Sequence, residues 1–294
     1  MPRIRSVSAI ASAVCIVLLL HQPTPASGTD EPPRGSVVTV AGTGESGYSG
    51  DGHDAVDARL NDRLNIDLDS GGTLYIADRD NQRLRVVEPD GTIDTVPGTR
   101  GERSPETEDT DVDDWIYGPG NAPIAVATDE TDAVYVAARN DLRVIDPDGE
   151  FTTVVDGSGD DSGADFRGDG DGGDGGPAIE AALYRALDVA VGDAGTLYIA
   201  DTSNDRIRVV DTDGEIDTLA GGGGDPLTEA TEAAEAHLPR PQSVALDSTG
   251  AVYVTVENRA AVFRVAPDGS LQVVAGTGDP GYAGDGGPAT EAQL

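Results

Sequence analysis

The chain has 294 residues, and 54 acidic against 19 basic residues give it a net charge of −35. All of the basic residues are arginine. This acidity argues against a nucleic-acid partner and against attraction to an anionic membrane, because both require a basic surface. The single cysteine, Cys15, excludes a disulfide framework and a cysteine-based zinc site.

The first 26 residues have the layout of a secretory signal peptide. Arg3 and Arg5 form a positive start, residues 7–20 are almost wholly apolar, and a small-residue cleavage site follows at 24–26. The apolar stretch is too short to span a bilayer comfortably. We therefore expect residues 1–26 to be a signal peptide, residues 27–35 to be a mobile lead-in, and the exported chain to be secreted without membrane insertion.

From residue 36 onward, one unit of about 60 residues recurs four times. Each unit opens with a short apolar strand, at 64–69, 124–129, 187–193 and 243–247. A second strand follows, with a tyrosine in the same place each time: Tyr75, Tyr135, Tyr198 and Tyr253. A third strand contains arginine, at 83–87, 142–146, 206–210 and 262–266. A Pro-Asp-Gly or Thr-Asp-Gly turn then leads into a fourth short strand, as expected for hairpin chemistry.

This pattern predicts an all-β fold, a β-propeller of four-stranded antiparallel blades, over residues 36–294. The repeats run approximately over 61–99, 117–157, 184–222 and 239–277. The alternative, a disordered acidic chain, does not explain four copies in register. Each blade buries little by itself, but stacked blades share a core.

The residues carry a resemblance to a known repeat. GYAGDGGPATEAQL at 281–294 and TLYIADTSNDRIRVVDTDGEIDTLAG at 196–221 resemble the bacterial form of the NHL repeat. The resemblance covers residues 36–294 and implies a binding propeller, commonly six-bladed, of the kind found in secreted proteins, receptor-kinase ectodomains and teneurin-like proteins. It implies no single activity, because function belongs to sites rather than folds.

The strands found in the sequence are not sufficient to complete a closed ring of blades. The glycine-ended fourth strand occurs five times but the first three strands only four times, so the strand at 36–42 is an orphan. We expect an incomplete six-bladed propeller, with roughly two repeats or on the order of 100 residues missing after Leu294. The alternative is an open form closed by self-association, since natural proteins avoid exposed strand edges.

Two candidate sites consist of polar residues. A DxxNxR motif, following the second strand of the first and third units, forms a candidate ligand face: Asp78, Asn81, Arg83, Asp201, Asn204 and Arg206. The alternative, which the repetition favours, is that these residues cap turns and pair between strands. Asp169, Asp171 and Asp174, in a glycine-rich stretch, are a candidate calcium site, the only cofactor considered; a structural turn with an acidic insertion is favoured over it.

Signals for catalysis are few. Outside the signal peptide there are two histidines, His53 and His237, and no lysine for Schiff-base chemistry. The first strands, expected to line the channel, offer mainly Ile and Val, with Asp67 at most as an acid. Trp115 is expected to be partly buried at a blade junction.

We therefore expect a secreted, non-catalytic binding or scaffold module. Its acidic face, formed by inter-blade segments and second-to-third-strand loops, would contact a protein or carbohydrate ligand. The alternative from another class is an extracellular metal-dependent lyase or lactonase-like hydrolase with a carboxylate site in the channel.

Overall fold

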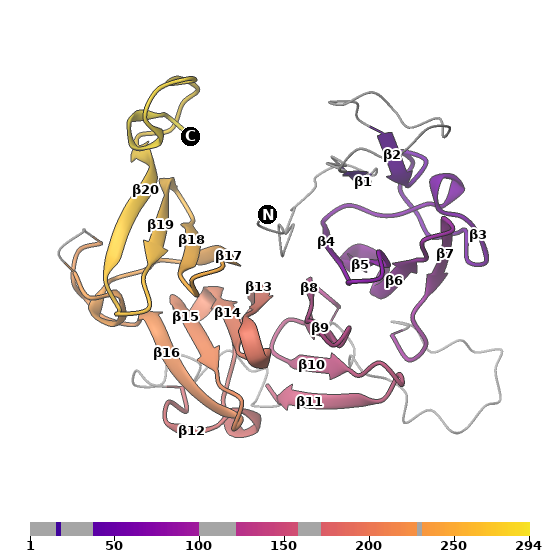
Figure 1. Cartoon of the computed structure of the whole chain (residues 1–294), viewed down its shortest axis with the longest axis horizontal. Coiled ribbons are helices and arrows are strands. Elements are labelled where there is room, and N and C mark those ends of the chain that lie inside the picture. Colours follow the sequence, from indigo (N-terminus) through magenta and orange to yellow (C-terminus); the bar gives the residue numbers. More distant parts are fainter. Residues whose placement is uncertain (1–15, 19–37, 100–121, 158–171, 228–230) are drawn as a thin grey trace.

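The computed structural model describes residues 16–18, 38–99, 122–157, 172–227 and 231–294. Within these ranges the chain forms four antiparallel blade sheets that lie side by side along an open arc, and a further two-stranded sheet (Figure 1). The regular elements other than strands are short 3-10 turns. The predicted all-β propeller arrangement with four blades is thereby confirmed.

The blades follow one another in chain order, and within each blade the strands pair consecutively. Blade 1 contains β4 (Leu64–Leu68), β5 (Leu74–Asp78), β6 (Arg83–Val87) and β7 (Thr92–Thr95). Blade 2 contains β8 (Ala125–Thr128), β9 (Val134–Ala137), β10 (Leu142–Ile145) and β11 (Phe151–Val155). Blade 3 contains β13 (Ala186–Val191), β14 (Leu197–Asp201), β15 (Arg206–Val210) and β16 (Glu215–Gly221). Blade 4 contains β17 (Pro241–Leu246), β18 (Val252–Val256), β19 (Arg259–Val265) and β20 (Leu271–Gly278).

The hydrophobic core lies between blades rather than inside one. Buried side chains of blade 3, such as Ile207, share a cluster with Val254 and Phe263 of blade 4. Ile199 of blade 3 shares another cluster with Leu142 of blade 2. Because neighbours cover both faces of an inner blade, its first strand is buried along most of its length: Ala125, Val126 and Ala127 of β8 are all buried.

The inter-blade segments fold onto the blades that follow them. In the segment before blade 1, β3 (His53–Asp54) adds a fifth strand beside β7, and β12 (Gly176–Pro177) does the same beside β16. A 3-10 turn follows in each segment, at Ala55–Asp57, Ala178–Glu180, Ala233–Glu235 and Ala289–Glu291. The predicted orphan strand is β2 (Val38–Ala41), which lies outside the four blades and pairs with β1 (Ile16–Leu18).

The glycine that ends the fourth strand allows a close approach of two backbones. Gly221 has φ +84, and a Cβ placed there would lie 2.2 Å from the carbonyl oxygen of Asp205, in the loop before β15. Gly276 shows the same geometry, with the carbonyl oxygen of Ala260 at 2.1 Å. No side chain fits in this space, which explains why the fourth strand ends in glycine in the repeat.

Replacing Gly221 by alanine should therefore destabilise the protein through a backbone clash as well as through strain. We expect G221A to lower the free energy of unfolding by about 3 kcal/mol or more. The matched control is G214A, because Gly214 has φ +80 but no atom within 4 Å of its added Cβ. That control should cost only the left-handed strain, about 1–2 kcal/mol. Urea denaturation measures both, and equal losses would contradict the close-approach explanation.

Candidate functional site

The DxxNxR residues of blade 1 lie between the blade and the segment that precedes it. Asp78 is fully buried at the end of β5, and its carboxylate accepts hydrogen bonds from Asn61 N (3.2 Å) and Asn81 Nδ2 (2.8 Å). Asn81 Nδ2 also donates to the carbonyl oxygen of Gly47 at 2.7 Å. The Arg83 guanidinium lies over the Tyr48 ring, with 3.8 Å between Cζ and the ring centroid.

Blade 3 repeats this arrangement. Asp201 is fully buried and accepts hydrogen bonds from Tyr184 N (2.8 Å) and Asn204 Nδ2 (2.9 Å), while Arg206 contacts Thr218 Oγ1 at 3.4 Å. Burial raises the pKa of Asp201 to about 6. In both blades the motif therefore joins a blade to its segment, and a role of these residues in contacting a ligand stays a prediction.

A buried arginine on the third strand completes each junction, and the sequence interpretation missed it. Arg85 is fully buried on β6, with its Nη2 2.6 Å from Asp51 Oδ1 and its Nη1 3.9 Å from Asp78 Oδ2. Arg208 on β15 pairs with Asp174 and lies 3.8 Å from Asp201. The signal was present in the sequence, since a Gly-Asp-Gly segment precedes each of the two strands with an Arg-x-Arg pattern.

Of the three candidate calcium ligands, only Asp174 lies within the described residues. It occupies the Gly-Asp-Gly position that Asp51 occupies before blade 1, and it forms an ion pair with Arg208. Asp169 and Asp171 lie outside the described ranges, as does Trp115. Within those ranges no group of three or more acidic, histidine or cysteine residues could hold a metal ion. Calcium binding stays a prediction.

The first strands carry more polar groups than the sequence interpretation expected. It named Asp67 as the only acid there, which is wrong, because Asp188 on β13 is also buried. Asp67 Oδ2 accepts hydrogen bonds from Thr128 N (2.6 Å) and Thr128 Oγ1 (3.0 Å) on the next blade. Asp188 Oδ2 accepts them from Ser243 Oγ (2.7 Å) and Val244 N (3.0 Å).

These acids, together with Asn65, connect neighbouring blades. Asn65 Oδ1 accepts a hydrogen bond from Val126 N at 2.8 Å, so β4 satisfies two amides on the open edge of β8. An innermost strand has no further strand to pair with, and a buried amide left without an acceptor would be costly. Strand alternation could not identify these residues, because both faces of the strand are buried.

The end of the blades that lies opposite the inter-blade segments carries a concentrated negative charge. We call it the turn face: it consists of the first-to-second-strand turns (69–72, 129–132, 192–195, 247–250) and the third-to-fourth-strand turns (88–92, 146–150, 211–215, 266–270). These eight turns hold no Arg, Lys or His. They hold fifteen exposed or half-buried acidic residues: Asp69, Glu88, Asp90, Asp129, Glu130, Asp132, Asp146, Asp148, Glu150, Asp193, Asp211, Asp213, Glu215, Asp247 and Asp268.

Several of these acids are held in their ionised form by their own turns. Hydrogen bonds from the Thr249 hydroxyl and from backbone amides lower the pKa of Asp247 to about 2. Hydrogen bonds from Ser270 lower the pKa of Asp268, and those from Thr92 lower that of Asp90. Arginine lies nearby at one place, where Arg264 Nε is 3.9 Å from Asp247 Oδ2.

Arginines gather instead at the opposite end, which we call the segment face. It consists of the inter-blade segments and the loops between second and third strands, and these hold Arg59, Arg63, Arg79, Arg139, Arg185 and Arg240. The sequence interpretation expected the acidic ligand face at this end. The turn face, which it did not single out, is acidic without interspersed arginine.

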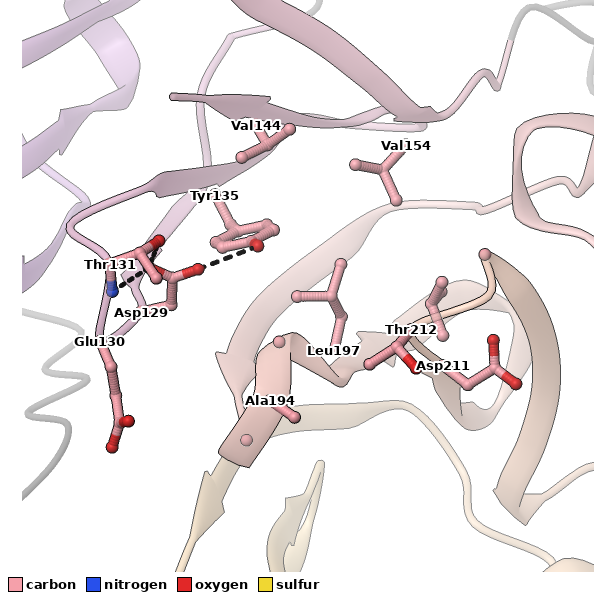
Figure 2. Close-up of a pocket in the computed structure, with 14 residues that line it drawn as sticks. Asp129, Glu130, Thr131, Tyr135, Val144, Val154, Ala194, Leu197, Asp211 and Thr212 are labelled. Carbon is pink, nitrogen blue, oxygen red and sulfur yellow. Dashed lines mark hydrogen bonds between the residues drawn. The ribbon is translucent and has the colours of Figure 1, made fainter. Parts of the chain in front are cut away.

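A cavity of about 450 Å³ opens on the turn face between blades 2 and 3 (Figure 2). Its apolar wall consists of Val144 and Val154 from blade 2 and Leu197 and Val210 from blade 3. Polar groups from both blades border it: Asp129, Glu130, Thr131, Asp211 and Thr212. Tyr135 also lines it, with its hydroxyl 3.2 Å from Asp129 Oδ2.

A glycine in the 192–195 turn leaves space open toward blade 2. In blade 2, Asp129 caps its own turn, and Asp132 Oδ1 accepts a hydrogen bond from Ser70 N of blade 1 at 3.1 Å. The position in blade 3 that corresponds to Asp132 is Gly195, which has no side chain to extend toward blade 2. A Cβ added to Gly195 would lie 3.9 Å from the Tyr135 hydroxyl, so this glycine borders the cavity.

No protein-family model matches the chain. It is similar to Teneurin-3 of Mus musculus, 28% identical over 231 residues, which cover 69% of this chain and 8% of that protein. Teneurin-3 of Danio rerio is 28% identical over 275 residues, covering 80% and 9%. The chain thus spans less than a tenth of the length of these curated relatives.

Among solved structures, virginiamycin B lyase from Staphylococcus aureus aligns with a TM-score of 0.45 and 14% identity, covering 71% of this chain and 53% of that one. The similarity to Teneurin-3 agrees with the resemblance of the repeat to those of teneurin-like proteins. The assignment to NHL repeats stays a prediction.

Among the described residues, no helix has the length and apolarity needed to cross a membrane.

Removing the carboxylate of Asp51 should destabilise blade 1, because it would leave the buried Arg85 without its nearest anion. We expect D51A to lower the free energy of unfolding by about 3 kcal/mol. The matched control is D285A in the C-terminal Gly-Asp-Gly copy, where the carboxylate contacts only the Tyr282 hydroxyl at 3.4 Å. That variant should change stability by less than about 0.5 kcal/mol. Similar effects in urea denaturation would refute the ion-pair assignment.

The stability contribution of Asp67 should depend on pH. Burial raises its pKa to about 6, well above the usual value, so the folded state binds a proton that the unfolded state releases. The stabilisation from this group is therefore complete below about pH 4 and is lost as the pH rises through about 6. An asparagine can accept both Thr128 bonds without a charge.

We expect D67N to be more stable than the wild type by on the order of 2 kcal/mol at pH 7.5, and the difference to shrink toward pH 4.5. D67A, which loses both bonds, should be less stable at either pH. Thermal unfolding at the two pH values measures this. A stability difference between wild type and D67N that does not change with pH would contradict the raised pKa.

Proposed function

We propose that this protein is an extracellular, non-catalytic binding module whose turn face contacts a partner with a basic surface. The observation that carries the proposal is the charge of this face, with fifteen acidic residues in eight turns that lack any basic residue. Such a surface attracts cations and speeds the approach of a basic partner. Of the two ligand classes expected from the sequence, the charge favours a protein over a neutral carbohydrate.

The other polar groups described above form hydrogen bonds within the protein rather than facing a ligand, and this supports the same proposal. The DxxNxR residues join blades to segments, and the acids of the first strands hold neighbouring blades together. The acids of the turn face bond mainly within their own turns, so one carboxylate oxygen can remain open to a partner. Asp146 is an example, since its Oδ1 accepts hydrogen bonds from the backbone amides of Asp148 and Glu150.

The signal peptide predicted from the sequence supports the extracellular location in this proposal. The similarity to Teneurin-3, which covers a small part of that protein, is compatible with a module that serves within larger assemblies.

A hexa-arginine peptide tests the proposal, with affinity measured by calorimetry in 50 mM and 300 mM salt. Binding should weaken with salt, because exposed charges are screened. One variant neutralises four turn-face acids: Asp90→Asn, Asp148→Asn, Asp213→Asn and Asp268→Asn. The matched control changes the charge equally on the segment face: Asp57→Asn, Asp62→Asn, Glu235→Gln and Asp285→Asn.

The turn-face variant should bind about tenfold more weakly than the wild type, since exposed pairs contribute a few tenths of a kcal/mol each. The segment-face control should remain within about twofold. Equal weakening in both variants would show that net charge alone attracts the peptide. No binding of the wild type in 50 mM salt would refute the proposed function.

A further inference from the structure

We infer that the cavity between blades 2 and 3 is a receptor site for a single arginine side chain of the partner. The inference rests on the proposed function and names the part of the turn face that would give it specificity. Figure 2 shows the Tyr135 ring and the Leu197 side chain among the residues that line this space, and the Tyr135 hydroxyl donates a hydrogen bond to Asp129. A volume of about 450 Å³ is in the range of sites that enclose a small ligand group.

The lining residues suit both the apolar stem and the charged guanidinium group of an arginine side chain. Val144, Val154, Leu197 and Val210 form an apolar wall, against which the three-carbon stem of the arginine can pack. The Tyr135 ring offers an aromatic surface, which attracts a guanidinium group by a cation–π interaction. An anionic ligand would be repelled by the carboxylates that border the cavity.

Carboxylates at the entrance provide the charge that a guanidinium needs. Asp129 comes from blade 2 and Asp211 from blade 3, so each blade contributes a carboxylate to the lining. The Asp129 carboxylate lies beside the Tyr135 ring, with its Oδ2 3.2 Å from the Tyr135 hydroxyl. Because a guanidinium group stacks on an aromatic ring and donates in a fixed fork, this pair favours arginine over a point charge such as lysine.

The cavity depends on the blade 3 turn rather than on the repeat in general. Gly195 stands where blade 2 has Asp132, and its φ of +88 is of the left-handed kind that Asp132 also adopts at +65. An asparagine at position 195 therefore suits the backbone and would extend toward Tyr135 without changing the net charge.

The test uses the full chain and the tripeptide acetyl-Gly-Arg-Gly-amide, with affinity measured by NMR titration. A second tripeptide with citrulline in place of arginine has the same shape but no charge. We expect arginine to bind and citrulline to bind about tenfold more weakly or not at all. G195N should weaken arginine binding about tenfold, whereas G250N, at the same turn position of blade 4 and outside the cavity lining, should leave it unchanged.

A second pair of variants keeps the test independent of how well G195N folds. Asp129→Asn with Asp211→Asn should abolish binding of the arginine tripeptide. Asp247→Asn with Asp146→Asn, the corresponding acids at turns outside the cavity lining, removes the same charge and should reduce binding less than about threefold.

Equal effects of the two pairs, full binding by G195N, or equal affinity for citrulline would each overturn the inference. Hexa-arginine binding that survives G195N would still support the turn face as a whole, so the two proposals can fail separately.

Discussion

The structure depends on two cations buried inside a very acidic chain. Arg85 and Arg208 are almost inaccessible to solvent, and each lies between an acid from its own blade and an acid from the preceding segment. A buried charge without a partner costs several kcal/mol, so the segment must dock wherever such an arginine stands. Docking in turn fixes Asn81 and Tyr48 against blade 1, and it gives the sheets of blades 1 and 3 an added outer strand.

This requirement explains why the two ends of the blades differ in their distribution of charged residues. Segments and second-to-third-strand loops meet at one end, where arginines pair with acids within the protein. The hairpin turns at the other end need only a residue that caps its own turn, and aspartate does this at nearly every turn. Local turn chemistry therefore produces a uniformly negative surface, which a partner can recognise without any change in the fold.

Much of the fold could be predicted because the same pattern of strands and turns occurs four times in the sequence. A single copy of the pattern would have been ambiguous. The tyrosine strands, the Pro-Asp-Gly turns and the glycine-ended strands predicted four blades of four antiparallel strands, which the structure confirms. The added strands at His53–Asp54 and Gly176–Pro177 could not be predicted, since two residues carry no periodicity.

The candidate site was harder to predict, because its residues form no recognisable sequence motif. Only their positions in the folded structure bring them together. Asp188 looks like any strand-edge acid, yet it bonds to the next blade. The cavity is open toward Tyr135 because Gly195 has no side chain, and no sequence motif marks the absence of a side chain. The turn face could have been found by placing the hairpin aspartates on the propeller topology before assigning a ligand face.

The C-terminal segment, residues 279–294, shows which part of the repeat is a self-contained piece. It forms the same internal bonds as the copy before blade 1: Gly281 N donates to Leu294 O at 3.1 Å, as Gly47 N does to Leu60 O. Yet Tyr282 is 90% exposed where Tyr48 is 40% exposed, and Leu294 is 51% exposed where Leu60 is fully buried. The backbone bonds that close the segment are therefore separate from the contacts that bury its tyrosine and leucine. The bonds lie within the segment itself, whereas the burial of Tyr48 and Leu60 comes from the blade against which the first copy packs.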